Sequence, residues 1–275
     1  MVARFQTASD LHIDRYFPYQ TPSPIEFDAR MQTLLQPHPH LHLIVAGDIT
    51  RVVDRNDLYV LFLQWCSQNW KHVFIICGNH EYYVESVLPQ DAPSMDDINK
   101  YIKDVCRALG NVHFLNNSRM SILEDGYPPV HIWGGTLWSR CLLDISLPIY
   151  VPRGTTTSRE EMDVQCYNEL HEKSLQSLML FIRDMMSEED DAMVIVVTHH
   201  SPTFKHMRPS HRNTRRSSMY ATDLEYLFQR EFVDVWIAGH THDNIDMNPH
   251  HPLRTRFISN CDPEEPTYNP TFLFS

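Results

Sequence analysis

This sequence lacks the features that would place a protein in a membrane or outside the cell. No apolar stretch among its 275 residues approaches the roughly 20 residues that a membrane-spanning helix needs. The amino terminus, Met1 to Phe5, leads straight into a predicted strand and shows no signal-peptide pattern. The six cysteines include no Cys-x-x-Cys pair, and several lie inside apolar runs. We therefore expect free buried thiols, no membrane contact, and a location in the cytosol or the nucleus.

Positive charge is also scarce. The chain has 23 lysines and arginines against 35 aspartates and glutamates, which gives a formal net charge of -12. This balance argues against nucleic acid binding over the whole surface, although bound cations would reverse the local sign inside a metal site. The apolar fraction of 42% is ordinary for a globular protein. Because there is no internal repeat and no low-complexity linker, residues 1–275 are expected to form a single domain.

The sequence does contain short β-rich apolar runs that alternate with segments of helical period. The predicted strands are Arg4–Ser9, Leu41–Ala46, His72–Cys77, Val112–Leu115, Met120–Leu123, Val130–Gly134, Met193–Thr198, Val233–Ala238 and Thr255–Ser259. The predicted helices are Glu26–Gln36, Asn56–Gln68, Met95–Leu109, a long one within Arg159–Met186, and Asp223–Gln229. Irregular segments are expected at Tyr16–Ile25, Ser139–Ser158, Phe204–Ser218 and Met247–Arg254. Early βα units and a strand-rich middle part indicate a mixed α/β fold.

Five short polar motifs each follow one of the apolar runs. They are Asp10-Leu11-His12, Gly47-Asp48, Gly78-Asn79-His80-Glu81, Thr198-His199-His200 and Gly239-His240-Thr241-His242. Because open α/β sheets place ligand sites at the carboxyl ends of their strands, we expect the motifs to meet. Carboxylates, imidazoles and an amide suit divalent cations of hard to borderline character. The motifs therefore indicate metal-assisted hydrolysis.

Each motif has a simpler explanation when it is taken alone. Asp10 and His12, one residue apart at the end of a strand, would point the same way, but a turn aspartate beside a surface histidine is the commoner arrangement. Asp48 could bridge two cations or cap a helix. Adjacent residues of an extended segment point to opposite faces, so we favour His199 as a ligand and place His200 near the substrate or in the packing. Five such motifs after five apolar runs make the simple explanations improbable together.

The five motifs together resemble the calcineurin-like metallophosphoesterases, whose pattern reads D-x-H, G-D, G-N-H-[ED], H and G-H-x-H in this order. The match runs from Asp10 to His242, and it looks closest to a small branch of single-domain members. The resemblance implies a four-layer αββα sandwich of two mixed sheets flanked by helices. It also implies two divalent metal ions, which are manganese, iron or zinc in this family. The implied ligands are Asp10, His12 and His242 for the first metal, Asn79, His199 and His240 for the second, and Asp48 as the bridge.

The resemblance also implies a reaction, which is hydrolysis of a phosphomonoester or phosphodiester by a hydroxide that bridges the metals. His80 is the expected general acid, and the resemblance implies that a carboxylate orients its other ring nitrogen. Asn79 and His80 are expected to meet the charge on the phosphoryl oxygens, and His200 is a further candidate for substrate contact. Glu81 is expected to be structural, as a cap of the following turn. No serine or cysteine nucleophile motif is apparent.

The expected substrate is small or nucleotide-like. Protein phosphatases of this superfamily read G-D-x-V-D-R-G and L-R-G-N-H-E. Here Asp54-Arg55 lies too far beyond Asp48, and Cys77 stands where the second pattern has its arginine. Two alternatives stay open, namely a nuclease acting on single-stranded nucleic acid and a non-catalytic interaction module on the same fold. The complete set of motifs favours an enzyme.

Two further groups of residues lie outside the five motifs. The basic stretch Lys205–Arg216 lies between two motifs, and it could attract an anionic or polymeric substrate or form a solvated loop. The second group is the alternating trio His38, His40 and His42. Prolines interrupt the backbone beside these histidines, and no carboxylate partner is evident, so we expect all three at the surface.

Overall fold

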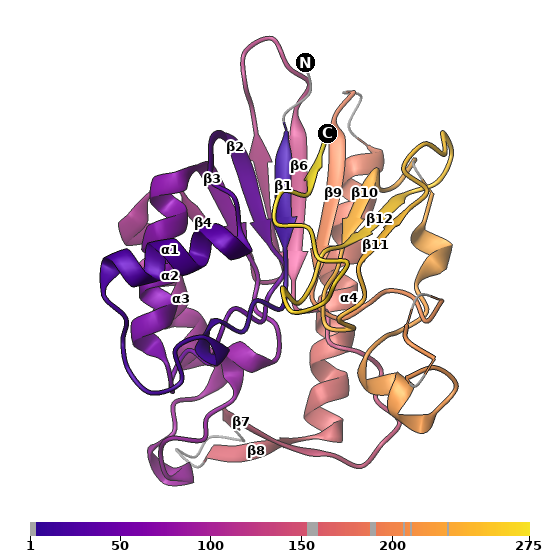
Figure 1. Cartoon of the computed structure of the whole chain (residues 1–275). Coiled ribbons are helices and arrows are strands. Elements are labelled where there is room, and N and C mark those ends of the chain that lie inside the picture. The colour runs from indigo at the N-terminus through magenta and orange to yellow at the C-terminus, as the bar shows by residue number, and fades with distance from the viewer. Residues whose placement is uncertain (1–3, 153–158, 188–190, 206, 210, 230) are drawn as a thin grey trace.

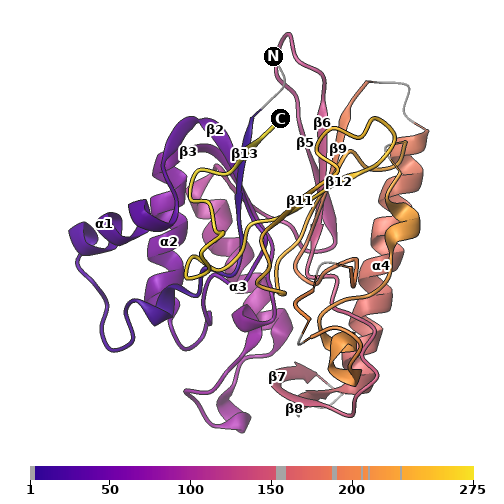
Figure 2. The same ribbon diagram turned by 45° about the vertical axis from the view of Figure 1, so that its right-hand side comes forward.

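Two β-sheets lie face to face, and helices cover the outer face of each (Figure 1). The structure is a computed structural model that describes residues 4–152, 159–187, 191–205, 207–209, 211–229 and 231–275. Three helices flank the first sheet and one long helix flanks the second, as the turned view also shows (Figure 2). The expected four-layer sandwich is therefore confirmed.

The first sheet has five strands in the order β13-β1-β2-β3-β4. Its members are β1 (Phe5–Ala8), β2 (His38–Val45), β3 (Trp70–Ile75), β4 (Val112–Phe114) and β13 (Leu273–Phe274). The strands from β1 to β4 run parallel, and β13 pairs antiparallel with β1 at the edge. The carboxyl ends of β1, β2 and β3 consequently lie together.

The second sheet has six strands in the order β11-β12-β10-β9-β6-β5. Its members are β5 (Ser118–Ile122), β6 (Val130–Gly135), β9 (Met193–Thr198), β10 (Val235–Ile237), β11 (Ile245–Met247) and β12 (Arg256–Ser259). The four inner strands are parallel, whereas β5 and β11 are antiparallel to their neighbours. Both sheets are therefore mixed, with antiparallel strands at their edges.

Capping chemistry fixes where several helices begin and end. The helices are α1 (Pro24–Leu34), α2 (Asn56–Asn69), α3 (Met95–Leu109) and α4 (Val164–Met186). Reciprocal bonds between a serine and an acidic residue three positions later begin α1 at Ser23 and α3 at Ser94, which satisfies amide groups that a helix leaves open. Helix α3 ends at Gly110, whose φ of 80° suits glycine.

The apolar runs are continuous because both faces of each sheet are buried. Along β2, Leu43 and Val45 belong to the core that α1, α2 and α3 cover, whereas Ile44 belongs to the core between the sheets. Along β9, Ile195 lies between the sheets and Val196 packs with residues of α4. Alternate residues of one strand therefore join neighbouring layers, and this fixes the register of the strand.

Three local predictions are wrong. The segment expected to be irregular at Ser139–Ser158 contains β7 (Ser146–Pro152), which pairs with β8 (Arg159–Asp163) because its apolar residues are buried; residues 153–158 lie outside the described part. Strand β8 also occupies the start of the range predicted for the long helix, which begins only after the cap Asp163. The predicted helix Asp223–Gln229 forms a single 3-10 turn, since so short a segment has little helical stability of its own.

The prediction of surface positions for His38, His40 and His42 is wrong at the third residue. His42 is 2% exposed, and its Nε2 lies 3.5 Å from the Glu124 carboxylate. The prolines are tolerated because β2 has a register irregularity between His38 and His42. The ring of His42 stacks on His72, whose Nδ1 lies 3.1 Å from Nε2 of His113. We call His42, His72 and His113 the histidine row.

Two expectations from composition can be compared with the structure. No helix within the described residues combines the length and apolar character needed to cross a membrane. All six cysteines are free thiols, and five of them are buried, as expected.

Candidate metal centre

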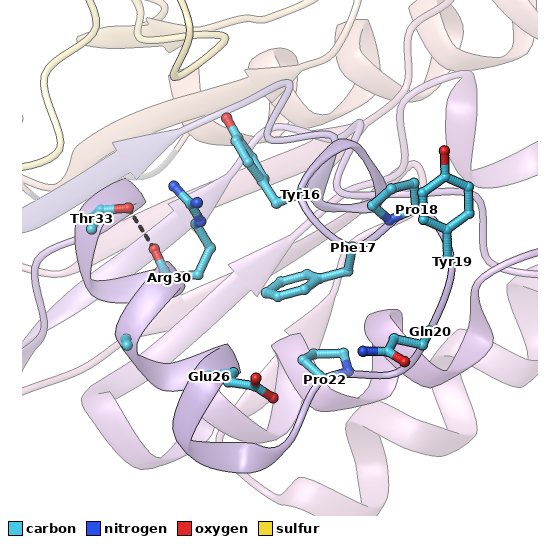
Figure 3. A pocket seen from close by; sticks show the side chains of 10 residues that line it. Tyr16, Phe17, Pro18, Tyr19, Gln20, Pro22, Glu26, Arg30 and Thr33 are labelled. Carbon is cyan, nitrogen blue, oxygen red and sulfur yellow. Dashed lines mark hydrogen bonds between the residues drawn. The ribbon is translucent and has the colours of Figure 1, made fainter.

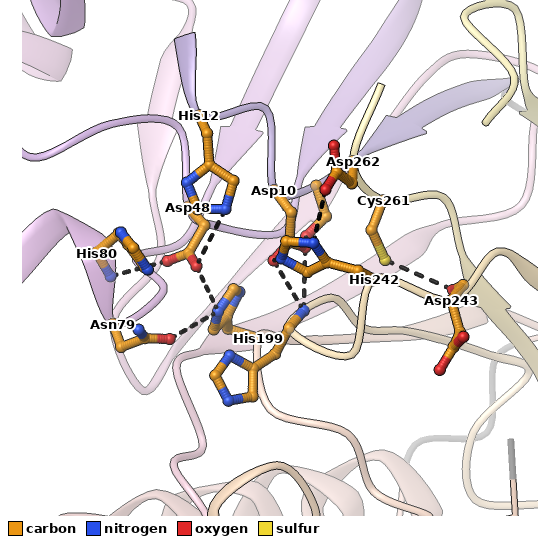
Figure 4. Close-up of polar contacts among 12 residues, drawn as sticks. Asp10, His12, Asp48, Asn79, His80, His199, His242, Asp243, Cys261 and Asp262 are labelled. Carbon is orange, nitrogen blue, oxygen red and sulfur yellow. Dashed lines mark hydrogen bonds and ion pairs between the residues drawn. The ribbon is translucent and has the colours of Figure 1, made fainter. Parts of the chain in front are cut away.

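The five motifs meet in the loops that follow β1, β2, β3, β9 and β10 (Figure 4). Both sheets contribute, so residues far apart in the sequence come into contact. For example, the backbone amide of His240 donates to the Asp10 carboxylate at 3.0 Å, across 230 positions. The expectation that the motifs meet at one end of the strands agrees with this arrangement.

Five motif residues have a left-handed backbone, which is uncommon for residues with a side chain. The φ angles are 54° for Asp10, 40° for His12, 56° for Asp48, 67° for His240 and 54° for His242. Such conformations cost about 1–2 kcal/mol each and persist where the surroundings enforce them, often at functional sites. Asp10 and His12 therefore converge through a sharp turn and not through the strand alternation that the sequence suggested.

Two glycines let the loops after β2 and β3 approach each other. A Cβ atom on Gly47 would lie 2.4 Å from the backbone nitrogen of Gly78, and a Cβ on Gly78 would lie 2.1 Å from Oδ1 of Asp48. Gly47 also has a φ of 86°, which L side chains rarely adopt. A side chain at either position would displace Asp48.

The first group of possible ligands is Asp10, His12 and His242, which each place an oxygen or ring nitrogen within 4.8 Å of the others. Nε2 of His242 lies 3.3 Å from Oδ1 of Asp10. Nε2 of His12 is buried and has no hydrogen-bond partner among the residues that the structure describes. Buried polar atoms are normally satisfied, so this nitrogen fits a metal that would complete the group.

A carboxylate that the sequence analysis missed lies behind the first group. Oδ2 of Asp262 is 2.7 Å from Nδ1 of His242, and Arg15 approaches the same carboxylate at 3.2 Å. This contact leaves Nε2 of His242 directed at Asp10, which is how an outer carboxylate orients a ligating imidazole. Asp262 closely follows β12, so its position after an apolar run is the signal that could have revealed it.

The second group is Asp48, His199 and His240. Nε2 of His199 lies 3.3 Å from Oδ2 of Asp48 and 3.1 Å from Oδ1 of Asn79. Its other nitrogen, Nδ1, lies 2.8 Å from the carbonyl oxygen of Ala46 and donates to it. The Ala46 bond therefore directs Nε2 toward Asp48 and Asn79.

Asp48 lies between the two groups. Its Oδ2 is 3.9 Å from Nε2 of His12 in the first group and 3.3 Å from Nε2 of His199 in the second. It also forms a third set of possible ligands with His12 and His80. A carboxylate in this position can bind two cations through its two oxygens.

Glu81 ties the loops after β2 and β3 together. Its buried carboxylate accepts hydrogen bonds from the backbone amides of Asp48 at 2.9 Å, Ile49 at 2.6 Å and Gly78 at 2.7 Å. Burial, together with the negative charge of Asp48, raises the pKa of Glu81 to about 8. The residue is structural, but it joins two loops instead of capping the following turn.

The four imidazoles of the two groups fall into two pairs, one with raised and one with lowered pKa values. Burial opposes protonation of His242, but hydrogen bonds to Asp10 and Asp262 outweigh it and raise its pKa to about 10. Burial also opposes protonation of His199, where the charge of Asp48 raises the pKa to about 9. Burial lowers the pKa of His12 to about 4 and that of His240 to about 3. Without cations, protons on two imidazoles balance the buried carboxylates, and bound cations would replace them.

His80 and Asn79 share a neighbour, Tyr83. The side-chain nitrogen of Asn79 donates to the hydroxyl of Tyr83 at 3.1 Å, while its Oδ1 faces His199. The His80 ring packs against the rings of Tyr83 and His12, with centroids 4.8 and 4.6 Å away. Within the described residues no carboxylate hydrogen-bonds the His80 ring, contrary to expectation; the backbone amide of His80 donates to Asp48 at 2.9 Å instead.

The expectation that His200 contacts substrate disagrees with its surroundings. His200 is 1% exposed. Its Nε2 lies 2.9 Å from the hydroxyl of Tyr167, and its Nδ1 lies 3.4 Å from the carbonyl oxygen of Thr136. Both ring nitrogens have partners inside the protein, and the ring lies 4.1 Å from that of His240, centroid to centroid, so His200 is the packed residue of the pair.

Part of the basic stretch Lys205–Arg216 is neutralised within the protein. Lys205 pairs with Glu225. Arg208 pairs with Asp243 at 3.2 Å and with Glu265 at 2.6 Å, and it donates to the carbonyl oxygen of His242 at 2.8 Å. His206 lies outside the described residues. Arg208 therefore braces the loop that carries a possible ligand, and it is not free to attract substrate.

Comparisons with known proteins agree with the fold and with the motifs. A family model described as calcineurin-like phosphoesterase matches residues 4–244. An uncharacterized protein of Acanthamoeba polyphaga mimivirus is 24% identical over 221 residues, which are 75% of this chain and 73% of that protein. The crystal structure of the phosphopantetheinyl hydrolase PptH from Mycobacterium tuberculosis matches with a TM-score of 0.62 and 16% identity, over 95% of this chain and 89% of that one. The protein TT1561 of Thermus thermophilus matches with a TM-score of 0.51 and 12% identity, over 96% and 92%.

Proposed function

Because this chain belongs to the calcineurin-like phosphoesterase family, we propose that it hydrolyses phosphomonoesters or phosphodiesters with the help of two divalent cations. The family is metal-dependent, and the donor set of carboxylates, imidazoles and one amide suits manganese, iron or zinc. Asp10, His12 and His242 would hold one cation, and Asn79, His199 and His240 the other. These are the ligands that the resemblance to the family implies.

The observation that carries this proposal is the position of Asp48. A single-metal site needs no carboxylate shared between two ligand groups, whereas Asp48 contacts His12 on one side and His199 on the other. Nε2 of His12 is buried and forms no hydrogen bond to a described residue, and this supports a cation on that side of Asp48. Both features favour a dinuclear centre over a mononuclear one.

The reaction replaces the bond between phosphorus and the leaving alcohol with a bond to a water oxygen. The bound cations would supply the nucleophile by lowering the pKa of a water and would offset charge on the phosphoryl oxygens. His80 would donate a proton to the departing oxygen, a step that typically contributes about 10²–10⁴-fold to the rate. Asn79 would turn its side-chain oxygen toward the second cation, because its nitrogen is held by Tyr83.

A small or nucleotide-like substrate is favoured over a phosphoprotein. Cys77, at the position where protein phosphatases have an arginine, is buried and offers no positive charge. Arg55 is also unavailable, since it donates to the carbonyl oxygen of Phe17 and pairs with Asp57 at 3.1 Å. The structurally similar PptH is named for hydrolysis of a phosphopantetheinyl group, which supports a small organic phosphoester here as well.

The two alternative functions have less support. A nuclease would use the basic stretch to hold its substrate, but Lys205 and Arg208 are already paired within the protein. A non-catalytic interaction module has no need for left-handed backbone at Asp10, His12 and Asp48. Neither alternative is favoured by a specific observation.

The test is hydrolysis of a chromogenic monoester and a chromogenic diester by protein treated with a chelator and then reloaded with Mn²⁺. We expect activity on at least one ester, loss with the chelator, and recovery with Mn²⁺. The variant Asn79→Ala should be strongly impaired. If a fully loaded protein hydrolysed neither ester and Asn79→Ala left metal content unchanged, the interaction module would replace this proposal.

A further inference from the structure

The leaving group of a phosphoester must lie beside His80, because this residue would donate the proton to the departing oxygen. A cavity of about 840 Å³ between the loop after β1 and helix α1 (Figure 3) does not meet this condition, since its described lining includes neither His80 nor a candidate ligand. The ring of Tyr83 does lie beside His80, with centroids 4.8 Å apart. We call Tyr83, Tyr220 and His211 the ring wall.

The two tyrosines of the ring wall contact different members of the second ligand group. The hydroxyl of Tyr83 accepts a hydrogen bond from Asn79 at 3.1 Å, and the ring centroid of Tyr220 is 5.2 Å from that of His240. Asn79 and His240 both contact His199, which is fully buried. Because both tyrosines are partly exposed, they lie between the buried ligands and the solvent.

His211 extends the ring wall beyond His240. Its ring stacks on that of Tyr220, with centroids 4.8 Å apart and an angle of 5° between the planes. Nδ1 of His211 is buried and has no hydrogen-bond partner among the described residues. The hydroxyl of Tyr220 likewise forms no hydrogen bond to a described residue, and that of Tyr83 accepts one and keeps its own proton to donate. The wall therefore offers hydroxyl and imidazole donors to a ligand, and it contains no carboxylate.

The segment before α4 holds both tyrosines in place. The hydroxyl of Ser139 donates at 2.8 Å to the carbonyl oxygen of Ser218, two residues before Tyr220. Further along the same segment, the carbonyl oxygen of Pro148 accepts at 3.0 Å from the backbone amide that follows Tyr83. One segment thus fixes the loops that carry the two tyrosines, and the ring wall is part of the folded framework.

The loop that the stacked rings close is positively charged, although the chain as a whole is acidic. Residues 211–216 include three arginines and no aspartate or glutamate. Arg212, Arg215 and Arg216 are exposed, and none of them forms an ion pair with a described residue, in contrast to Arg208. Such charges raise the local concentration of anions.

We propose that the ring wall is the leaving-group subsite and that it takes an alcohol carrying a second phosphate. This inference rests on the proposed function. In the reaction the bond between phosphorus and the alcohol oxygen breaks, a water oxygen takes its place, and His80 gives its proton to the alcohol. The second phosphate accepts hydrogen bonds from Tyr220 and His211, and the nearby arginines attract it. A nucleic acid polymer fits less well, because three arginines stand against a net charge of -12.

Binding can be tested without catalysis. Fructose 1,6-bisphosphate and fructose 6-phosphate differ only in the second phosphate, and calorimetry with metal-free protein should give the bisphosphate a Kd at least about tenfold lower. Tyr220→Phe removes one donor and should weaken binding of the bisphosphate about tenfold. The matched control is Tyr19→Phe in the other cavity, at a residue that is 97% exposed; it should leave binding unchanged.

The role of the positive charge needs its own pair of variants. Arg215→Gln combined with Arg216→Gln should lower the preference for the bisphosphate about three- to tenfold. The control combines Lys100→Gln with Arg107→Gln on α3, where the side chains are 78% and 69% exposed. It removes the same net charge at a distance from the ring wall and should keep the preference. Equal losses in both double variants would show general attraction by net charge and would overturn the subsite.

The kinetic arm compares kcat/KM of the two sugar phosphates with Mn²⁺-loaded protein. We expect a preference of about tenfold for the bisphosphate, beyond the factor of about two that its second ester bond provides, and a smaller preference in Tyr220→Phe. If the protein hydrolyses the chromogenic monoester but neither binds nor hydrolyses the bisphosphate preferentially, the inference is overturned and the proposed function stands. If the bisphosphate binds through Tyr220 but no ester is hydrolysed, the subsite stands and the proposed function fails. Faster cleavage of a single-stranded oligonucleotide would overturn the inference in favour of a nuclease.

Discussion

Histidines gather in two places, in the loops after the strands of both sheets and within the first sheet itself, and their neighbours differ. At the carboxyl ends, His12, His199 and His242 lie within 4 Å of buried aspartates. Across β2, β3 and β4, the histidine row places the ring of His72 between that of His42, on which it stacks, and that of His113, to which it is tilted. Asp48 follows His42 by six residues on the same run, which corresponds to about 20 Å of extended chain.

The carboxylates explain why burial has opposite results in the two places. Asp10 and Asp48 overcome burial and raise the pKa values of His242 and His199. In the histidine row, burial lowers the pKa of His42 to about 4, although Glu124 acts against it. Spacing of histidines alone therefore does not distinguish a metal site from a packed row. Buried aspartates beside the histidines do.

The largest effect should come from removing the carboxylate between the two groups. We expect Asp48→Asn to lower kcat by well over 100-fold, because changes to outer residues alone cost about 10–100-fold. Metal content after dialysis, measured by mass spectrometry, should fall together with kcat. The control is His42→Gln in the histidine row, which should keep its metal content. Equal loss of metal in both variants would contradict the distinction between the candidate metal centre and the histidine row.

The outer carboxylate should have the next largest effect. Asp262→Asn weakens the contact that directs Nε2 of His242 toward Asp10, so metal affinity should fall about 10–100-fold. Calorimetric titration with Mn²⁺ measures this. The matched control is Glu264→Gln in the same loop, whose carboxylate is 60% exposed and lies 3.9 Å from Arg15. An affinity unchanged in Asp262→Asn would mean that His242 needs no such orientation.

A smaller effect is expected when the partner of Asn79 is removed. Tyr83→Phe keeps the ring that contacts His80 but removes the hydroxyl that accepts from Asn79, so kcat should fall about two- to tenfold. Affinity for the second metal should fall with it. Tyr82→Phe loses a comparable bond to Asn99, 2.7 Å long, away from the ligands, and should lower only thermal stability. The same result from both variants would make Tyr83 a packing residue.

The smallest effect is expected in the histidine row, as a change in how the free energy of unfolding depends on pH. The pKa of His42 falls from 6.5 in the unfolded chain to about 4 when folded, so the unfolded chain binds more protons between these values. Stability should therefore rise with pH from about 4 to 6.5. His42→Leu should remove at most about 1.4 kcal/mol per pH unit from that slope, as measured by urea unfolding. His250→Gln, in an exposed loop, should not change the slope.

Much of the fold and most of the site could be predicted because local pattern determines them. Apolar runs marked the strands, since both faces of each sheet are buried. Polar residues directly after these runs marked the site, because parallel strands bring their carboxyl ends together. Gly47 and Gly78 were visible for the same reason, as the residues that let two loops touch.

The features of the site and fold that could not be predicted depend on contacts between segments that are distant in the sequence. Asp262 gains its role from His242, which reaches it only in the folded chain. His42 is buried because Glu124 comes to it from the loop after β5 and His72 from β3. The packed position of His200 depends on Tyr167 of α4. No periodicity within one segment carries this information.

The central claim is that the five motifs form one centre for two cations. The most direct test is the number of Mn²⁺ ions bound per chain, measured after equilibrium dialysis of the wild type and of His242→Ala. We predict two ions for the wild type, and one tightly bound ion with greatly reduced turnover for His242→Ala. A wild type that binds one ion or none, or a His242→Ala variant with two ions and near-normal turnover, would contradict the claim.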